Sequence, residues 1–447
     1  MADMSRNEDP KREAILAAAF SQFSRYGYRR TSMEDIAKAT GISRPSLYSY
    51  FENKEEIFRC LSASLHEQTL GDAECHLKGA PGHSGEPLDL AARVEAALVA
   101  RLCPFHEVIA QSVIKPFCGT NHDAPGDAAV IAPLHGGTQG AVISNGIAPR
   151  YSDIDTYSMA AACVDEALRN AVCVGVDLDM IAGLDNFCWP DSVESAKTPD
   201  GRYKLAQLVR ANQAIDDVCR AYRLPCISGK DSMKNDVTMY GEKISVPPTI
   251  LFSLIGNHAD VRKAVSSDFK SAGDHIYLLG ETHQELGASE LAFMFRDECS
   301  GGIGGKVPSI NPERNLAMYR ALTSAMSEGL VVSAHDCSDG GLAVALAECC
   351  FGADSGASVD IGGLDSEHGR LDEWGALFGE SMGRILVSVS PSDSEGFSKA
   401  MGGSSCTLIG TVGEGDDITV RSGETDVLRA SMSKLRESWQ GALGGDA

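Results

Sequence analysis

The sequence predicts a multidomain protein in which a small all-α unit of three helices precedes a longer α/β (α+β) part. Two observations predict this division. Apolar residues recur with helical spacing over residues 10–60, whereas short β-rich segments alternate with amphipathic helical segments from Val113 onward. With 447 residues, 43% hydrophobic and 23% charged, the chain is long enough for two to four folded domains.

The N-terminal segment carries start and stop signals for three helices. An apolar stripe over residues 14–23 predicts a first helix that ends near Gly27. Ser32, followed two and three positions later by acidic residues, is typical of a capping box that opens a second helix, and Gly41 ends that helix. Ser43 then caps a short third helix. This pattern fits a helix-turn-helix, and it equally fits a small bundle that binds no ligand.

The segment TSMEDIAKATGISRPSLYSYFENKEEIF, residues 31–58, closely resembles the DNA-binding module of TetR-family repressors. The resemblance covers about residues 10–62 and implies that the third helix enters the major groove of DNA. It further implies that four residues read bases, namely Arg44, Pro45, Ser46 and Tyr48. Three others match positions that hold phosphates: Thr31, Tyr50 and Lys54.

TetR-family proteins continue with a larger helical domain that binds an effector and supplies the dimer interface. Residues 88–111 have the pattern of one amphipathic helix, but the pattern changes abruptly after Ser112. We therefore expect a TetR-like helix-turn-helix over residues 1–70, a truncated helical arm over residues 71–112 and a new domain from about residue 113.

Charge and cysteine usage narrow the classes of partner. The net charge is -23, and most of it lies downstream of Ser112, which argues against broad electrostatic binding to nucleic acid. The fourteen cysteines form no CxxC pair, and no apolar run is long enough to span a bilayer. We therefore expect reduced thiols, a cytoplasmic protein and no membrane partner.

In the longer part, the segment AHDCSDGGLAVALAECC, residues 334–350, predicts a strand, a glycine turn and a helix. Asp336 and Asp339 offer carboxylate oxygens at the turn, and Ser338 offers a hydroxyl. The glycines at 340–341 let backbone N–H groups approach an anion, beside the positive end of the helix. The arrangement suits a phosphate bound through Mg²⁺, although a lone turn of this kind is more often an ordinary loop.

More oxygen ligands fall on the helix predicted over residues 157–174. Glu166 and Asn170 are four residues apart and therefore share one helix face, and Asp127 stands at the start of a predicted strand. Together with Asp336 these residues would suit one hydrated Mg²⁺ ion. For the Glu/Asn pair alone, a solvated helix face is the simpler interpretation.

Four motifs occur in order along this part of the chain: DNFCWPD at 185–191, SGKDSM at 228–233, HDCSDGGLAVALAE at 335–348 and LFGES at 377–381. Together they closely resemble the C-terminal half of phosphoribosylformylglycinamidine synthase, over about residues 113–425. The resemblance implies a ligase that converts formylglycinamide ribonucleotide to its amidine in purine biosynthesis, with ATP, Mg²⁺ and ammonia from glutamine.

The fold that this resemblance implies is an aminoimidazole-ribonucleotide-synthetase-like (AIR-synthase-like) two-domain unit. It assigns an N-domain to residues 113–260, a C-domain to residues 261–425 and a tail to residues 426–447. Matched position by position, the Mg²⁺ ligands are Asp127, Glu166, Asn170 and Asp336. The nucleotide-binding residues are Gly229, Ser232 and Ser338. One departure is Lys230, which stands where the short form of the family has a metal-binding Asn, so we expect the metal arrangement of the long form.

Two functions of different classes remain open. In the first, the chain is half of an ATP-dependent synthase that needs partners carrying the missing first half and a glutaminase subunit, because the family's catalytic His lies in the first half. We name no catalytic residue in this chain. In the second, the chain is a TetR-type transcriptional regulator that binds duplex DNA as a homodimer. A chimera with neither function is the third interpretation.

Overall fold

The structure is a computed structural model of the chain. It describes residues 10–61, 112–119, 124–133, 137–297, 303–353, 355–364 and 371–441. These residues divide into two compact units whose boundary falls between Ser112 and Val113. The amphipathic helix expected over residues 88–111, and the truncated arm that it belongs to, lie outside the described residues.

The first unit contains three labelled helices: α1 (Pro10–Arg30), α2 (Met33–Thr40) and α3 (Arg44–Tyr48). Ser32 forms the predicted capping box with Asp35, because each accepts a hydrogen bond from the backbone N–H of the other. Gly41 ends α2 in the left-handed conformation, at φ +74°. The expected end of the first helix near Gly27 is wrong, since α1 continues to Arg30.

A small apolar core holds this unit together. Ile15 from α1, Ile36 from α2 and Leu47 from α3 are fully buried against one another, and a helical segment at 54–61 closes the core with Ile57. The three helices therefore present one shared apolar interior, as the helical spacing of the sequence predicted.

The second unit begins with a six-stranded sheet in the order β1-β4-β5-β10-β6-β7. The strands are β1 (Ser112–Ile114), β4 (Ala129–Ile131), β5 (Gly140–Ile147), β10 (Thr249–His258), β6 (Asp177–Cys188) and β7 (Cys226–Ser232). Strand β10 runs antiparallel to both β5 and β6, whereas β6 and β7 are parallel. Two short hairpins accompany the sheet: β2 (Phe117–Cys118) with β3 (Ala124–Pro125), and β8 (Asp236–Met239) with β9 (Glu242–Ser245).

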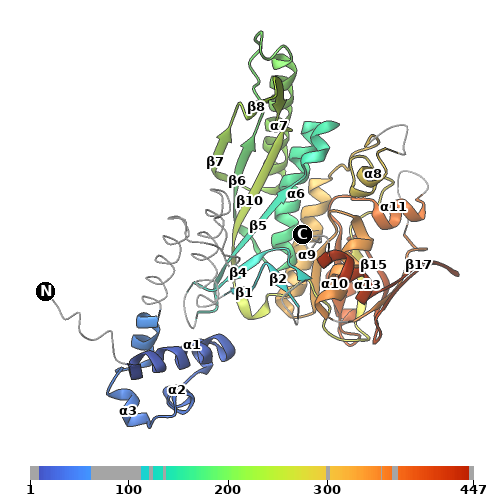
Figure 1. Cartoon of the computed structure of the whole chain (residues 1–447). Helices are drawn as coiled ribbons and strands as arrows, with labels where there is room; N and C mark the ends of the chain where they lie inside the picture. Colours follow the sequence, from blue (N-terminus) through green and yellow to red (C-terminus); the bar gives the residue numbers. More distant parts are fainter. Residues whose placement is uncertain are drawn as a thin grey trace. The chain divides into compact units, whose positions relative to one another are not determined.

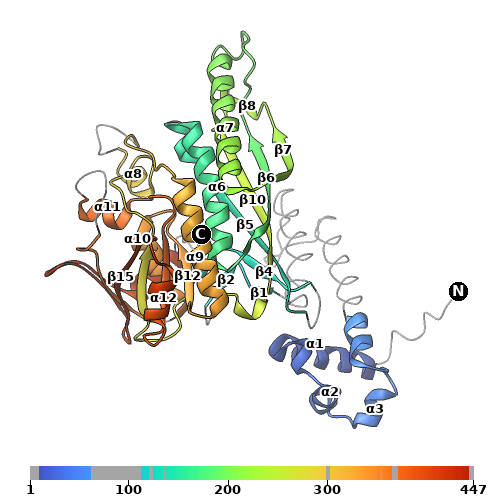
Figure 2. The same cartoon turned by 180° about the vertical axis from the view of Figure 1, so that it is seen from behind.

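Two long helices cover one face of this sheet, α6 (Thr156–Cys173) and α7 (Gly201–Tyr222), as Figures 1 and 2 show. A short 3-10 turn at Pro149–Asp153 lies between β5 and α6, and another at Val261–Lys263 follows β10. The strands and helices predicted for this region are thus present, and α6 carries the oxygen-bearing pair that the site requires.

A second sheet has seven strands in the order β12-β14-β11-β15-β13-β16-β17. They are β12 (Ser333–Asp336), β14 (Ile385–Val389), β11 (His275–Leu279), β15 (Cys406–Val412), β13 (Ala357–Asp360), β16 (Asp417–Ser422) and β17 (Thr425–Ser431). The accompanying helices are α8 (Glu290–Met294), α9 (Pro312–Glu328), α10 (Gly341–Ala353), α11 (Glu373–Phe378), α12 (Ser394–Ala400) and α13 (Met432–Gly441). Most of β17 and all of α13 fall in the segment expected as a tail.

Alternate residues of β11 enter two different cores. Tyr277 and Leu279 pack into a core that also contains α6, α7 and α9, whereas Ile276 and Leu278 pack with α10. The helices α6 and α9 thus lie between the two sheets, as both cartoon views show (Figures 1 and 2). This layering brings the helix α6 of the first sheet against the strand β12 of the second. Among the described residues, no helix is long and apolar enough to cross a membrane.

Candidate functional site

The glycine turn between β12 and α10 positions the candidate site. The strand β12 ends at Asp336, and α10 starts at Gly341. Gly340 and Gly341 both adopt left-handed conformations, at φ +76° and +66°. A Cβ atom on Gly341 would lie 2.5 Å from the carbonyl oxygen of Gly379. Glycine is therefore required here for the close approach that the turn makes.

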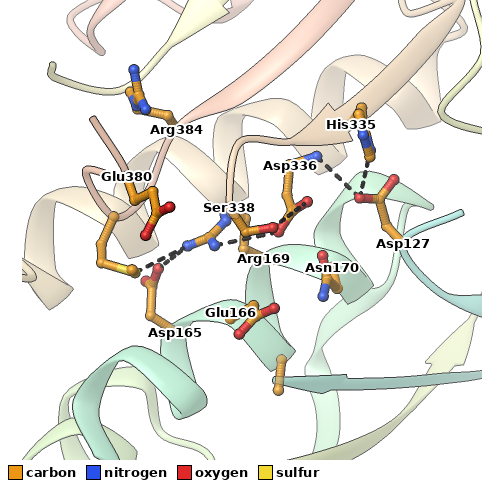
Figure 3. Close-up of polar contacts among 12 residues, drawn as sticks. Asp127, Asp165, Glu166, Arg169, Asn170, His335, Asp336, Ser338, Glu380 and Arg384 are labelled. Atoms are coloured by element: carbon orange, nitrogen blue, oxygen red, sulfur yellow. Dashed lines mark hydrogen bonds and ion pairs between the residues drawn. The ribbon is translucent and has the colours of Figure 1, made fainter. Parts of the chain in front are cut away.

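Two of the predicted metal ligands meet at this turn, as Figure 3 shows. The Oδ1 atom of Asp127 accepts a hydrogen bond from the backbone N–H of Asp336, at 3.0 Å. Asp336 is 5% exposed, and its Oδ1 atom accepts a hydrogen bond from the Ser338 hydroxyl at 3.3 Å. Burial raises the pKa of Asp336 above its ordinary value, although the Arg169 guanidinium acts in the opposite direction. Residues more than 200 positions apart thus converge on one point.

His335 lies beside this pair and joins two carboxylates. Its Nδ1 atom is 2.9 Å from Asp127 Oδ1, and its Nε2 atom is 3.0 Å from Glu348 Oε2, on α10. Burial disfavours a charged ring, but the Asp127 carboxylate and the hydrogen bonds to both acids raise the pKa of His335 well above its ordinary value. The ring is therefore an imidazolium that donates to both neighbours. Sequence reasoning did not single out His335 or Glu348.

The other two predicted ligands, Glu166 and Asn170, lie on α6 near Asp336 and Asp127 (Figure 3). Glu166 accepts a hydrogen bond from the backbone N–H of Ile147 at 2.9 Å, and Asn170 Nδ2 donates to the Asn145 carbonyl at 3.0 Å. Burial, followed by repulsion from Asp336, raises the pKa of Glu166 to about 8. A cation close to Glu166 would favour its charged form.

Two buried oxygen atoms in this cluster have no hydrogen-bond partner in the described part of the chain. They are Asp127 Oδ2 and Asn170 Oδ1. Buried polar atoms are nearly always paired, so an orphaned pair of acceptors needs an explanation. Carboxylate and amide oxygens are the ligands that Mg²⁺ prefers, and both atoms belong to residues predicted to hold it. The donor set therefore fits a hard divalent cation.

A second polar cluster adjoins the first and was not predicted. Arg169 is fully buried and forms ion pairs with Asp165 at 2.5 Å and with Asp336 at 3.3 Å. Asp165 Oδ1 also accepts hydrogen bonds from Tyr222, Asn315 and Tyr319, on α7 and α9. The sequence did contain a sign of this cluster, because Asp165 and Arg169 are an acid and a base four residues apart on a predicted helix. Such pairs usually lie on the exposed face of a helix. Here the pair links α6 to the second sheet.

Glu380, in the LFGES motif, accepts hydrogen bonds at the start of α10. Its Oε1 atom accepts from the backbone N–H groups of Gly340 and Glu290, both at 2.9 Å, and its Oε2 atom accepts from the Tyr151 hydroxyl at 3.1 Å. Burial raises the pKa of Glu380 to about 7. The side chain is 2% exposed, so Glu380 fixes the turn from inside the protein.

The remaining predicted nucleotide contacts divide between two places. Ser338 belongs to the cluster, through its bond to Asp336. Gly229 and Ser232 lie on β7, the edge strand of the first sheet, and within the described residues no hydrogen bond or ion pair joins them to the cluster. A Cβ atom on Gly229 would lie 2.1 Å from Asp185 Oδ1 on the neighbouring strand, so a larger residue there would require the Asp185 carboxylate to move.

In the first unit, the predicted base-reading residues lie on α3. Arg44, Pro45 and Tyr48 are exposed, and Ser46 is half-buried. The Arg44 guanidinium lies 3.8 Å from the Glu34 carboxylate. Of the predicted phosphate contacts, Thr31 is buried with its hydroxyl donating to the Gln22 carbonyl, and Lys54 donates to the Thr31 carbonyl at 2.8 Å. Tyr50 is half-buried against the small core.

Comparison with known protein families follows the same division. The model of the AIR synthase related protein N-terminal domain matches residues 125–251, and that of the C-terminal domain matches residues 271–423. The C-terminal part of this chain is AIR synthase-like. The model of the tetR family of bacterial regulatory proteins matches residues 15–61. These matches confirm both resemblances and the fold class predicted from the sequence.

Solved structures share the AIR-synthase-like fold at low identity. The chain is similar to Thermotoga maritima PurL complexed with FGAR, with a TM-score of 0.56 and 18% identity, covering 73% of this chain and 52% of that one. It is also similar to T. maritima PurL complexed with ATP, with a TM-score of 0.53, 17% identity and coverage of 71% and 47%. The chain thus spans about half the length of the PurL chains.

A third solved structure is matched over nearly the whole length of its chain. One chain of the HypE–HypF complex matches with a TM-score of 0.50 and 14% identity, over 68% of this chain and 93% of that one. The AIR-synthase-like pair of domains therefore also occurs as nearly the whole of a separate chain.

Proposed function

We propose that the AIR-synthase-like part binds ATP or ADP with Mg²⁺ and serves as the C-terminal half of a phosphoribosylformylglycinamidine synthase. The observation that carries the proposal is that Asp127 and Asp336 meet near Asn170 and Glu166 of α6, and that two buried oxygens there, Asp127 Oδ2 and Asn170 Oδ1, have no partner in the described part of the chain. A divalent cation would satisfy both oxygens and reduce the repulsion among the three carboxylates.

The turn before α10 supplies the other half of a nucleotide site. The N–H groups of Gly340 and Gly341 already donate to Glu380 and to the Ser338 carbonyl, so the positive end of α10 as a whole would attract a phosphate. The cation would offset the repulsion between that phosphate and the acids. Ser338 can donate to a phosphate oxygen, as the family resemblance implies. We assign Gly229 and Ser232 to a separate contact on β7, made with a substrate or nucleotide that a partner domain also holds.

Calorimetry on the full chain tests the proposal. We expect ADP or ATP to bind with Mg²⁺ and to bind much more weakly in EDTA. Asp336→Asn should weaken the Mg²⁺-dependent binding, since it removes one anionic ligand. The matched control is Asp260→Asn, because Asp260 caps the 3-10 turn at Val261–Lys263 and, among the described residues, makes no hydrogen bond or ion pair to the cluster. Nucleotide affinity that is equal with and without Mg²⁺ would contradict the proposal.

We assign the synthase activity to an assembly and not to this chain alone. The family's catalytic His belongs to the first half, so formylglycinamide ribonucleotide, ammonia and a glutaminase subunit would act on a complex. The strands of the first sheet support a partner there, because within the described part of the chain they expose four large apolar side chains: Ile143, Met180, Ile227 and Ile255. A homodimer or the missing half would cover these side chains.

An assay with formylglycinamide ribonucleotide, ATP and ammonium tests this assignment. We expect no amidine and no substrate-dependent ADP from the purified chain. Stoichiometric ADP release without added partner would overturn the assignment while leaving nucleotide binding intact.

A second candidate function is DNA binding by the TetR-type module. The exposed side chains of Arg44 and Tyr48 on α3 favour it, because a recognition helix must present such residues to base edges. The net charge of -23 opposes it, since negative charge repels phosphate. We expect weak, salt-sensitive binding. Selection from random duplexes at physiological salt tests this: a sharp palindromic site, lost on Arg44→Ala, would make the regulator the leading function.

A further inference from the structure

We propose that His335 and Glu348 are positioning residues that hold Asp127 so that it binds the cation through Oδ2 alone. This inference rests on the proposed function, since it concerns the same cation. It goes beyond that function by assigning roles to two residues outside the predicted ligand set, and by stating which oxygen of Asp127 is the ligand.

The hydrogen bonds of Asp127 distinguish its two oxygens. Oδ1 accepts from the His335 ring at 2.9 Å and from the backbone N–H of Asp336 at 3.0 Å. Oδ2 is buried and has no partner among the described residues. The side chain of Asp127 is 1% exposed, so solvent does not compete for either atom. Two donors on one oxygen fix the carboxylate plane and leave the second oxygen for a ligand.

Glu348 holds the ring from the other side. Its Oε2 atom lies 3.0 Å from His335 Nε2, and its position on α10 ties the ring to the helix that follows the glycine turn. The ring cannot rotate without losing one of its two carboxylate partners. Such outer hydrogen bonds commonly set ligand orientation, and removing one typically costs 10- to 100-fold in metal affinity.

The competing interpretation makes His335 itself a metal ligand. One ligand atom from each of Asp127, His335 and Asp336 lies within 4.8 Å of the others, which is a spacing that a metal site also shows. Against it, both ring nitrogens already face carboxylate oxygens at hydrogen-bonding distance. Each ring nitrogen therefore already points at a carboxylate oxygen, which leaves no direction in the ring plane for a metal, so the geometry places His335 outside the coordination sphere.

Spectroscopy of the unaltered full chain separates the two interpretations. Mn²⁺ replaces Mg²⁺ at oxygen sites and is visible by electron paramagnetic resonance. With ADP and Mn²⁺ bound, we expect no strong ¹⁴N coupling of the kind that a directly bonded imidazole produces. A directly coordinated nitrogen at the Mn²⁺ ion would overturn the proposal.

Two substitutions at His335 test which ring nitrogen matters. The amide of His335→Asn places an N–H donor near the position of Nδ1, whereas that of His335→Gln places one near the position of Nε2. We expect Mn²⁺ affinity to stay within about threefold for His335→Asn and to fall roughly 10- to 100-fold for His335→Gln. Equal losses in the two variants, or no loss in either, would contradict the positioning role.

Glu348 gives a second test that does not alter the ring. Glu348→Gln keeps an acceptor for Nε2–H and should retain most of the Mn²⁺ affinity, while Glu348→Ala should lose roughly tenfold. Thermal unfolding of each variant separates a folding defect from a loss of metal. If the unaltered chain binds neither Mn²⁺ nor nucleotide, the proposed function fails; if it binds both and the variants do not differ, only the positioning role fails.

Discussion

Two polar clusters lie side by side on α6 and differ in how their atoms are satisfied. Asp165 and Arg169 are both fully buried, and every oxygen of Asp165 accepts from a protein donor. One residue further along the helix, Asn170 keeps an oxygen that has no partner in the described part of the chain, as does Asp127 beside it. Arg169 Nε, a donor, also lacks a partner among the described residues. The two clusters therefore differ in their acceptor oxygens and not in their donors.

This difference in hydrogen bonding suggests different roles for the two clusters. A buried carboxylate that the protein satisfies fully with its own donors stabilises the fold and has no capacity for a ligand. A buried oxygen left without a donor costs free energy in the unliganded protein, which a bound cation would recover. The Asp165 cluster therefore joins the domains, and the Asp127 cluster is the place where a ligand would bind.

The largest effect is expected from Arg169→Met. Methionine fills the volume but leaves the carboxylates of Asp165 and Asp336 buried without their cation, and breaking such a pair costs about 3–5 kcal/mol. Urea denaturation should show this loss of unfolding free energy. The control is Arg220→Met, because Arg220 forms an exposed pair with Asp216 at the same helical spacing; its loss should stay below about 0.5 kcal/mol. Equal losses at both sites would remove the distinction.

A pH-dependent effect is expected from Glu380→Gln. The folded-state pKa of about 7 lies above the ordinary value of 4.5, so the folded protein holds a proton that the unfolded chain releases. The stability contributed by Glu380 is therefore fully present below pH 4.5 and is lost as the pH rises through 7. At about 1.4 kcal/mol per pKa unit, the variant should gain on the order of 3 kcal/mol relative to the parent between pH 4.5 and 8.

Denaturation of the parent and the Glu380→Gln variant across this pH range checks the sign. The difference between the two curves isolates Glu380 from other titrating groups. If the variant instead loses stability relative to the parent as the pH rises, the folded protein stabilises the charged form of the Glu380 carboxylate.

A smaller loss is expected from Tyr222→Phe. The change removes one donor to Asp165 and leaves those from Asn315 and Tyr319, so the expected loss is about 1.5 kcal/mol, at the low end for a hydrogen bond to a charged group. Mg²⁺-dependent nucleotide affinity should not change. The control is Tyr157→Phe, whose hydroxyl donates to Asp217 in an exposed pair. A drop in nucleotide affinity for Tyr222→Phe alone would connect the two clusters.

The sequence was sufficient to locate several elements and to place two oxygen-bearing side chains on one helix face. Apolar periodicity located α6, predicted over residues 157–174, and helical spacing alone placed Glu166 and Asn170 on one face. The turn at Gly340 was readable because left-handed positions select glycine. The capping box at Ser32 was readable for the same kind of local reason. These signals depend on residues within a few positions of one another.

The rest depends on contacts between distant residues, which local patterns do not encode. Arg169 meets Asp336 across 167 positions, and His335 meets Asp127 across 208. The end expected near Gly27 failed because a glycine costs only about 1 kcal/mol inside a helix, which neighbouring turns can offset. The order of the strands in each sheet could not be predicted either. It depends on which strands pack against the same helices, and those contacts join residues far apart in the sequence.

The smallest effect on stability is expected from Glu166→Gln, and it gives the sharpest contrast with Arg169→Met three positions away. Burial already keeps Glu166 protonated at neutral pH, since its pKa is about 8, and glutamine has the shape of the protonated acid. Its amide oxygen can still accept from the Ile147 N–H. The unfolding free energy without Mg²⁺ should therefore change by less than about 0.5 kcal/mol. Because an amide replaces a ligand that Mg²⁺ would ionise, nucleotide affinity with Mg²⁺ should fall while affinity in EDTA stays the same. A large loss of stability with unchanged Mg²⁺ dependence would place Glu166 with Asp165 among the structural acids.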